Sequence, residues 1–99
     1  MARHVVYRLK RTSQLVVIAQ SDWLDHLTTR VVVPLVPVDS ANVPQSRLNP
    51  IVEVKAIKYL AMTQALAAVR VADIEPTGEN LTNFHEKLVA ATDMLFEGY

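Results

Sequence analysis

The segment over residues 81–97 constrains the fold more than any other part of the chain, because it has the pattern of one amphipathic helix. At the 100° per residue of an α-helix, its side chains form one largely apolar stripe. The stripe consists of Leu81, Phe84, Leu88, Ala91, Thr92 and Leu95, with Val89 and Phe96 at its margins. Gly98 follows at the position where many helices end in a left-handed residue. The stripe is broad enough to pack on a sheet, so the pattern predicts a docked C-terminal helix.

Most of the remaining chain favours β-strands. Runs rich in β-branched residues alternate with polar or proline-containing turns, which is typical of short antiparallel strands. The predicted strands cover residues 5–9, 15–20, 30–36, 51–54, 57–63 and 66–74, and Pro76-Thr77-Gly78 is predicted to end the last one. This order predicts a mainly β fold, a small antiparallel barrel with the helix across one face. We expect a single domain over residues 1–99, β-rich over 3–75.

Composition excludes several classes of protein. Apolar residues make up 51% of the chain and charged residues 20%, which is incompatible with a disordered protein. The absence of Cys excludes disulfides and thiolate zinc sites, and a net charge of zero argues against a nucleic-acid-binding protein. The first residues lead directly into a strand-like run, and no apolar run reaches about 18 residues. We therefore expect a cytoplasmic protein that does not span a membrane.

Signals of catalysis are weak. His4, His26 and His85 lie far apart in the sequence, and no pair has the spacing of a helical or hairpin metal site. With only Gly78 and Gly98, a glycine-rich phosphate loop is not possible. His85 lies near the edge of the apolar stripe and is predicted to be a partly buried core residue. We expect no catalytic residue, no metal and no cofactor, and therefore a protein that is not an enzyme.

Two local patterns suggest binding, and each has a structural alternative. The basic cluster, Arg8, Lys10 and Arg11, lies at a predicted hairpin, where it is either a solvated turn or a partner-binding surface. Trp23 and Leu24 lie between polar turn formers directly after a strand. They are either buried beneath a loop or exposed as interface anchors, a role in which Trp is enriched. The residues alone do not separate these alternatives.

A resemblance covers essentially the whole chain. It is carried by an ordered set of short motifs: Val6-Tyr7-x-x-Lys10-Arg11-x-Ser13, Gln20-Ser21-Asp22-x-Leu24-Asp25, Arg30-Val31-Val32-Val33-Pro34-Leu35, Leu48-Asn49-Pro50-Ile51, Met62-Thr63, Val69-x-Val71 and Ala91-Thr92-Asp93-Met94-Leu95-Phe96-x-Gly98. In this order, the chain resembles the CcdB family of plasmid-addiction toxins. The resemblance implies an SH3-like barrel with a small extra sheet and a C-terminal helix, assembled as a homodimer.

The resemblance also implies a function. Toxins of this family bind the DNA gyrase A subunit and trap gyrase on cleaved DNA, without covalent chemistry of their own. A partner antitoxin covers the toxin with a segment that is disordered when free. By resemblance, the basic cluster would bind the antitoxin. The positions that would bind gyrase are Trp23, Leu24, Asp93, Phe96, Glu97, Gly98 and Tyr99.

Several of these positions depart from the family pattern. Glu97 stands where the pattern has Trp, Tyr99 and Asp93 where it has Ile and Asn, and Trp23 and Leu24 where it has two Ile residues. A CcdB-fold protein that keeps its antitoxin but has a lost or altered target therefore remains an alternative. So does a barrel domain that serves as a non-catalytic interaction module. Met94, which lies off the stripe near Phe96 and Tyr99, is predicted to lie at the dimer contact.

Overall fold

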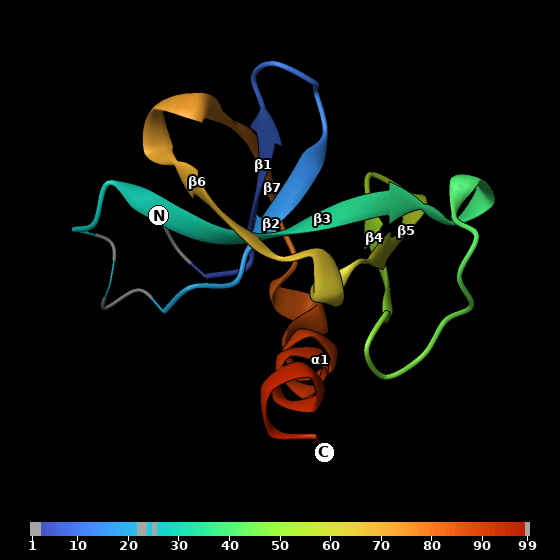
Figure 1. Ribbon diagram of the computed structural model, residues 1–99. Coiled ribbons are helices and arrows are strands. Elements are labelled where there is room, and N and C mark those ends of the chain that lie inside the picture. The colour runs from blue at the N-terminus through green and yellow to red at the C-terminus, as the bar shows by residue number, and fades with distance from the viewer. Residues whose placement is uncertain (1–2, 22–23, 25, 99) are drawn as a thin grey trace.

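The computed structural model describes residues 3–21, 24 and 26–98. Seven strands precede one helix, α1 (His85–Glu97), in the described chain, as Figure 1 shows. The strands are β1 (Val5–Leu9), β2 (Leu15–Ile18), β3 (Thr29–Pro37), β4 (Ile51–Val54), β5 (Ile57–Ala61), β6 (Ala67–Arg70) and β7 (Ile74–Asn80). Short 3₁₀ turns lie at Val38–Ser40, Thr63–Ala65, Val71–Asp73 and Thr82–Phe84.

The long strand β3 belongs to two antiparallel sheets. Its first half pairs with β2 and β6, and β2 continues through β1 to β7, which gives the curled order β6-β3-β2-β1-β7. Its last residues pair with β5, which pairs with β4, and these three strands form a smaller second sheet. This arrangement confirms the predicted mainly β fold, an SH3-like small barrel with an extra sheet and one C-terminal helix.

Strand β2 is buried on both faces, so its side chains separate two cores. Val17 packs into a larger cluster with Val6, Val33 and Leu35, which α1 covers. Val16 and Ile18 point the other way, into a smaller cluster with Val32 and Ile74 inside the curled sheet. The alternation of side chains along a strand therefore explains why residues 15–18 read as a continuous apolar run.

Helix α1 packs through the predicted stripe. Leu81, Leu88 and Ala91 are 1%, 6% and 0% exposed, and Phe84 packs against the larger core from its margin. The helix begins at His85 rather than near residue 81, because Thr82–Phe84 form a 3₁₀ turn after the Asn80 side chain accepts a hydrogen bond from the backbone N–H of Thr82 (3.1 Å). Gly98 ends it in the left-handed conformation (φ 83°), as predicted.

The strand boundaries near Pro76 differ from the prediction. The predicted strand over residues 66–74 is broken by the turn at Val71–Asp73, and β7 continues through Pro76-Thr77-Gly78 to Asn80. The register of β1 against β7 shifts between Val5, which pairs with Asn80, and Tyr7, which pairs with Pro76. A step of two positions along β1 therefore corresponds to a step of four along β7. The bulge accommodates Pro76 and the left-handed Gly78 (φ 84°) in an edge strand. Thr77 Oγ1 secures it by donating to the Val6 carbonyl (2.7 Å).

Candidate functional surfaces

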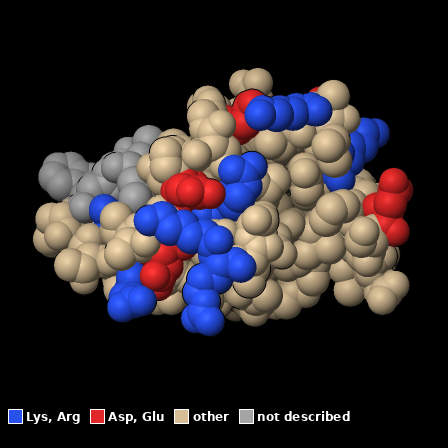
Figure 2. All heavy atoms as spheres, turned by 90° about the horizontal axis from the view of Figure 1, so that it is seen from above, with Lys and Arg blue, Asp and Glu red and all other residues tan. Residues whose placement is uncertain are grey.

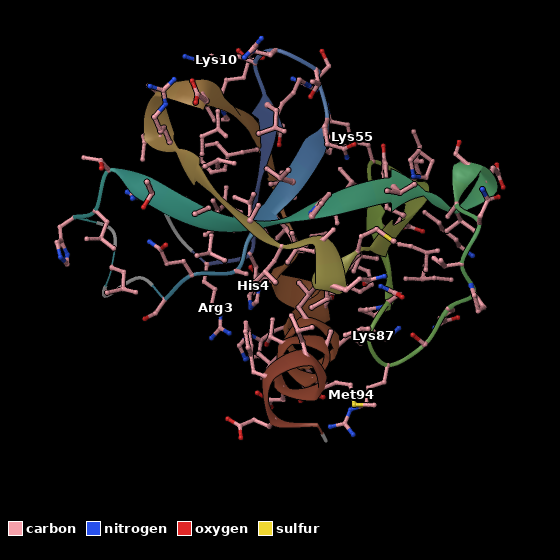
Figure 3. The ribbon with its side chains drawn as sticks, viewed as in Figure 1. Arg3, His4, Lys10, Lys55, Lys87 and Met94 are labelled. Atoms are coloured by element: carbon pink, nitrogen blue, oxygen red, sulfur yellow. The ribbon has the colours of Figure 1, made fainter. Side chains whose placement is uncertain are left out.

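The last turn of α1 forms an exposed apolar tip. The helical pattern predicts Phe96 at the margin of the buried stripe, but its side chain is 68% exposed. Met94, one turn earlier than Gly98, is 38% exposed and lies near the C-terminal end of the helix (Figure 3). Tyr99, also predicted here, lies outside the described residues. Large apolar side chains exposed together are typical of interaction surfaces.

Two carboxylates share this tip. Asp93 and Glu97 are exposed and lie four residues apart, so they are neighbours on one side of α1. Neither forms a salt bridge with another side chain in the described ranges. The helix C-terminus carries the negative end of the helix dipole, which adds to their charge. The tip therefore combines apolar area with an uncompensated negative charge.

The loop between β2 and β3 carries a second exposed apolar surface. Leu24 and Leu27 are 42% and 41% exposed, on two successive turns in which each N–H bonds the carbonyl three residues earlier. The buried side chain of Gln20 connects Leu24 to β3. Its Nε2 donates to the Leu24 carbonyl (3.1 Å), and its Oε1 accepts from the Val31 N–H (3.1 Å). Leu24 is therefore displayed rather than buried, whereas Trp23 lies outside the described residues.

Arg30 anchors the other end of this loop, a role that no pattern in the sequence predicts. The Arg30 side chain is only 5% exposed, and its Nη1 donates to the carbonyls of Leu27 and Thr29. Satisfying two carbonyls with one guanidinium holds the turn at the start of β3 in place. Gln20 and Arg30 thus hydrogen-bond the backbone carbonyls of the two exposed leucines, Leu24 and Leu27.

The basic cluster lies on the β1–β2 hairpin, at the end of the molecule opposite the helix tip (Figure 1). Lys10 and Arg11 are exposed, whereas Arg8 is half-buried. The Lys10 N–H donates to the Asp73 carbonyl (3.0 Å), which attaches the hairpin to the turn after β6. Seen from above in Figure 2, Lys and Arg side chains gather near the middle of this face with carboxylates beside them.

Arg70 and Asp73, which were not predicted as site residues, extend this surface. Arg70 donates twice to the Asp73 carboxylate, from Nε at 2.9 Å and from Nη2 at 3.2 Å. The hydrogen bond from Arg70 holds the pKa of Asp73 below its usual range, and the charges of Arg11 and Lys10 lower it further. The sequence signal that could have identified this pair is the spacing of two opposite charges three residues apart.

The histidines are not all separate in space. His4 Nε2 lies 2.8 Å from His85 Nδ1, and the two rings meet edge to face with centroids 4.9 Å apart. The prediction that His85 is a partly buried core residue is wrong, because His85 is exposed as a whole and only its ring reaches the buried His4. In the part of the chain that the structure describes, no three His, Asp, Glu or Cys side chains could hold a metal ion together.

The chain matches a known protein family over nearly all of its length. The family described as CcdB protein matches residues 3–98. This chain belongs to the CcdB family. Family membership implies the toxin of a toxin–antitoxin pair rather than a catalytic enzyme. A search of curated proteins finds no significant match.

The CcdB match covers every element that carries a surface described above. Its range includes the basic hairpin, the loop with Leu24 and the helix tip with Phe96 and Glu97. In addition, no helix among the described residues is long and apolar enough to cross a membrane. The described surfaces are suited to binding, because they present exposed apolar and charged side chains on a packed β framework.

Proposed function

We propose that this CcdB-family chain is a toxin that binds the DNA gyrase A subunit in the cytoplasm and traps gyrase on cleaved DNA. The observation that carries the proposal is the exposure of Phe96 at the C-terminal end of α1. At 68%, it is the most exposed of the large apolar residues that the structure describes. An aromatic ring on a rigid helix end buries a large area when a partner covers it, with little loss of side-chain freedom.

The helix tip and the β2–β3 loop act together in this proposal. Leu24 supplies aliphatic area, and its backbone carbonyl accepts a hydrogen bond from the buried Gln20 side chain. Arg30 donates to the carbonyl of Leu27 farther along the same loop. Asp93, Phe96, Glu97 and Gly98 supply the helix side of the contact. Trp23 and Tyr99 complete the proposed set from the loop and the end of the chain.

The carboxylates of Asp93 and Glu97 require a basic partner surface in this proposal. A charge buried in an interface loses its hydration, and only an opposite charge or good hydrogen-bond donors compensate that loss. A gyrase surface with Arg or Lys facing the tip would provide this compensation. This requirement also supports the second candidate, a CcdB-fold toxin whose target differs from that of relatives with Trp at the position of Glu97.

The antitoxin binds elsewhere on the toxin in this proposal, at the basic cluster. Lys10 and Arg11 are exposed at the hairpin turn, and Arg8 precedes them on β1. An acidic antitoxin segment, disordered when free, would be attracted by these charges and would order on binding. We further propose that the toxin is a homodimer with Met94 at its two-fold contact, and that it serves plasmid maintenance.

The test is a cleavage assay with the purified chain, gyrase and supercoiled plasmid, scored for linear DNA after the complex is denatured. We expect linear DNA with the native chain. Phe96→Ala should lower potency by about tenfold or more, because losing an aromatic anchor typically costs about 2 kcal/mol. Ile57→Ala is the matched control, since Ile57 is a large apolar residue that is 53% exposed on the β4–β5 hairpin.

Two results would contradict the proposal. If the native chain forms no linear DNA with gyrase at any concentration, gyrase is not the target. If Phe96→Ala and Ile57→Ala lower potency equally, the helix tip is not the contact surface.

A further inference from the structure

One side of α1 carries a stripe of side chains that changes from basic to acidic along the helix. The stripe consists of Lys87, Ala90, Met94 and Glu97, which fall within an arc of about 80° at 100° per residue. Lys87, Met94 and Glu97 are exposed, and Ala90 is half-buried. Lys87 and Met94 lie on the side of α1 toward the loop before β4 (Figure 3). The stripe is therefore open to a partner that approaches from this side.

The two ends of the stripe carry charges without an ionic partner in the fold. Neither Lys87 nor Glu97 forms a salt bridge with another side chain among the residues that the structure describes. Lys87 Nζ lies 5.9 Å from the centre of the Phe84 ring, an attraction that leaves the ammonium charge in place. The two residues are about 15 Å apart along the helix axis, too far to pair within one chain. Both charges are thus available to another molecule.

A pocket of about 370 Å³ lies between this stripe and the loop before β4. Lys87 and Ala90 line it from α1, and Arg47 and Pro50 line it from the loop. The short side chain of Ala90 leaves space, and a flexible methionine side chain is suited to filling an irregular pocket. The pocket thus has room for an inserted apolar side chain and has two cations in its lining.

The loop wall of the pocket is attached to the second sheet. The Asn49 N–H donates to Ser46 Oγ (3.1 Å), and the Ser46 N–H donates to the Asn49 carbonyl (3.2 Å). The buried Asn49 side chain donates in turn to the carbonyl of Ala61 at the end of β5 (3.2 Å). These hydrogen bonds hold the loop next to Arg47, so the wall is formed before a partner binds.

The stripe is complementary to itself in the antiparallel direction. Met94 follows Lys87 by seven residues, and Glu97 follows Ala90 by seven residues. A second, antiparallel α1 that places its Met94 opposite Ala90 therefore also places its Glu97 opposite Lys87. A two-fold axis repeats both contacts. Charge and side-chain size thus favour the same register.

We infer that two copies of this chain pair through antiparallel α1 stripes. Lys87 of each copy forms an ion pair with Glu97 of the other, and Met94 of each copy packs against Ala90 of the other. The inference rests on the proposed homodimer, and it adds the register of the contact and its cross-chain ion pairs.

This pairing also gives the carboxylate at the helix tip a partner. Because Lys87 of the second copy compensates the charge of Glu97, only Asp93 requires a basic group from gyrase. Phe96 points about 100° around the helix from Glu97, so its ring stays outside the contact between the two copies. The dimer and the gyrase contact therefore use different sides of the helix end.

A charge swap tests the ion pair. Lys87→Glu and Glu97→Lys should each raise the dissociation constant of the dimer about tenfold, because two attractions in each dimer become repulsions. The double variant restores opposite charges and should return the constant to within about threefold of the native value. Lys58→Glu makes the same charge change at an exposed residue of β5 and should have little effect. Light scattering over a concentration series at low salt measures the constants, and circular dichroism checks that each variant is folded.

Cysteine cross-linking tests the register, because the native chain contains no Cys. An oxidised mixture of Lys87→Cys and Glu97→Cys chains should form a covalent dimer. Either variant alone should not, since its two cysteines would lie about 15 Å apart along the antiparallel helices, beyond the reach of a disulfide. Lys58→Cys mixed with Glu97→Cys is the control and should also stay uncross-linked.

Three outcomes would overturn the inference. The first is a double variant that dimerises no better than the single charge reversals, and the second is equal cross-linking of the mixture and of either cysteine variant alone. The third is a Lys87→Glu chain that dimerises normally but linearises less plasmid, which would assign the pocket to gyrase. A native chain that stays monomeric would refute the proposed homodimer itself, whereas a native dimer that ignores the charge reversals would refute only this register.

Discussion

His4 Nε2 lies 2.8 Å from His85 Nδ1, so a residue directly before β1 is hydrogen-bonded to the first residue of α1, 81 positions later. The His4 backbone is also fixed: its N–H donates to the Ile18 carbonyl and its carbonyl accepts from the Leu81 N–H, both at 2.8 Å. Its left-handed φ of 70° is uncommon for a residue with a side chain. His4 therefore connects β2, the approach to α1 and the helix itself.

Removing this contact should destabilise the fold modestly. His85→Ala deletes the imidazole and its hydrogen bond to His4, and we expect a loss of about 1 kcal/mol in the free energy of unfolding. Glu86→Ala, at the next exposed position of α1, is the control. Equal denaturation midpoints for the two variants would show that the histidine contact does not contribute.

The docking of α1 on the larger core can be tested at Leu88, which is 6% exposed. Leu88→Ala should lower the free energy of unfolding by about 2–5 kcal/mol, because it leaves a cavity between the helix and the sheet. Chemical denaturation followed by far-ultraviolet circular dichroism measures the change. A loss below about 0.5 kcal/mol, the size of an ordinary surface substitution, would contradict the assignment of the buried face.

The ion pair between Arg70 and Asp73 should make the free energy of unfolding depend on pH. Because the pKa of Asp73 is lowered in the folded state by the Arg70 hydrogen bond, the folded chain binds fewer protons at this site than the unfolded chain. The pair thus adds stability above the ordinary pKa of Asp, about 3.9, and loses it as the pH falls through the lowered value. The stability difference between the native chain and Asp73→Asn should be constant near neutral pH and shrink below about pH 4. A difference that widens on acidification would refute this.

Assembly can be tested at Met94, which is 38% exposed near the helix tip. At micromolar concentration, light scattering should give the native chain the mass of a dimer of 11.1 kDa subunits. Met94→Glu should shift the measured mass toward that of the monomer. Ile57→Glu, at the exposed turn of β4 and β5, should leave the mass unchanged. A native mass near that of one chain, independent of concentration, would rule out the proposed dimer.

Restoring an aromatic at position 97 should alter potency against gyrase. Glu97→Trp removes one of two neighbouring carboxylates and adds a large ring beside Phe96, so plasmid linearisation by a gyrase sensitive to Trp-tipped relatives should strengthen about tenfold. If Glu97→Trp has no effect while Trp23→Ala abolishes linearisation, the anchor of the contact lies in the β2–β3 loop instead.

Features set by local spacing were predictable from the sequence. The stripe through Leu81, Leu88 and Ala91 follows from the helical repeat, and Gly98 ends the helix for a local steric reason. The two hairpins follow from strand residues around polar turns. These elements depend on neighbours within a few positions, so the chain encodes them directly.

Features set by distant partners were not predictable. Pro76 and Gly78 have the pattern of a strand end, yet they lie in a strand because β1 tolerates a bulge opposite them. The contact between His4 and His85 depends on the path of the whole sheet. Arg11 on the β1–β2 hairpin and Arg70 at the end of β6 lie about sixty residues apart in the sequence, yet they line the same groove.

The pairing of β1 with β7 has a consequence for how the protein forms. This ladder joins Val5 to Asn80, so β1 pairs with a strand that lies far away in the sequence. Closing so long a loop costs entropy before the contact is gained, and folding dominated by such pairings is slow. On the ribosome, β1 therefore keeps an unpaired edge until β7 has been made, and the nascent chain is most prone to aggregation during that interval.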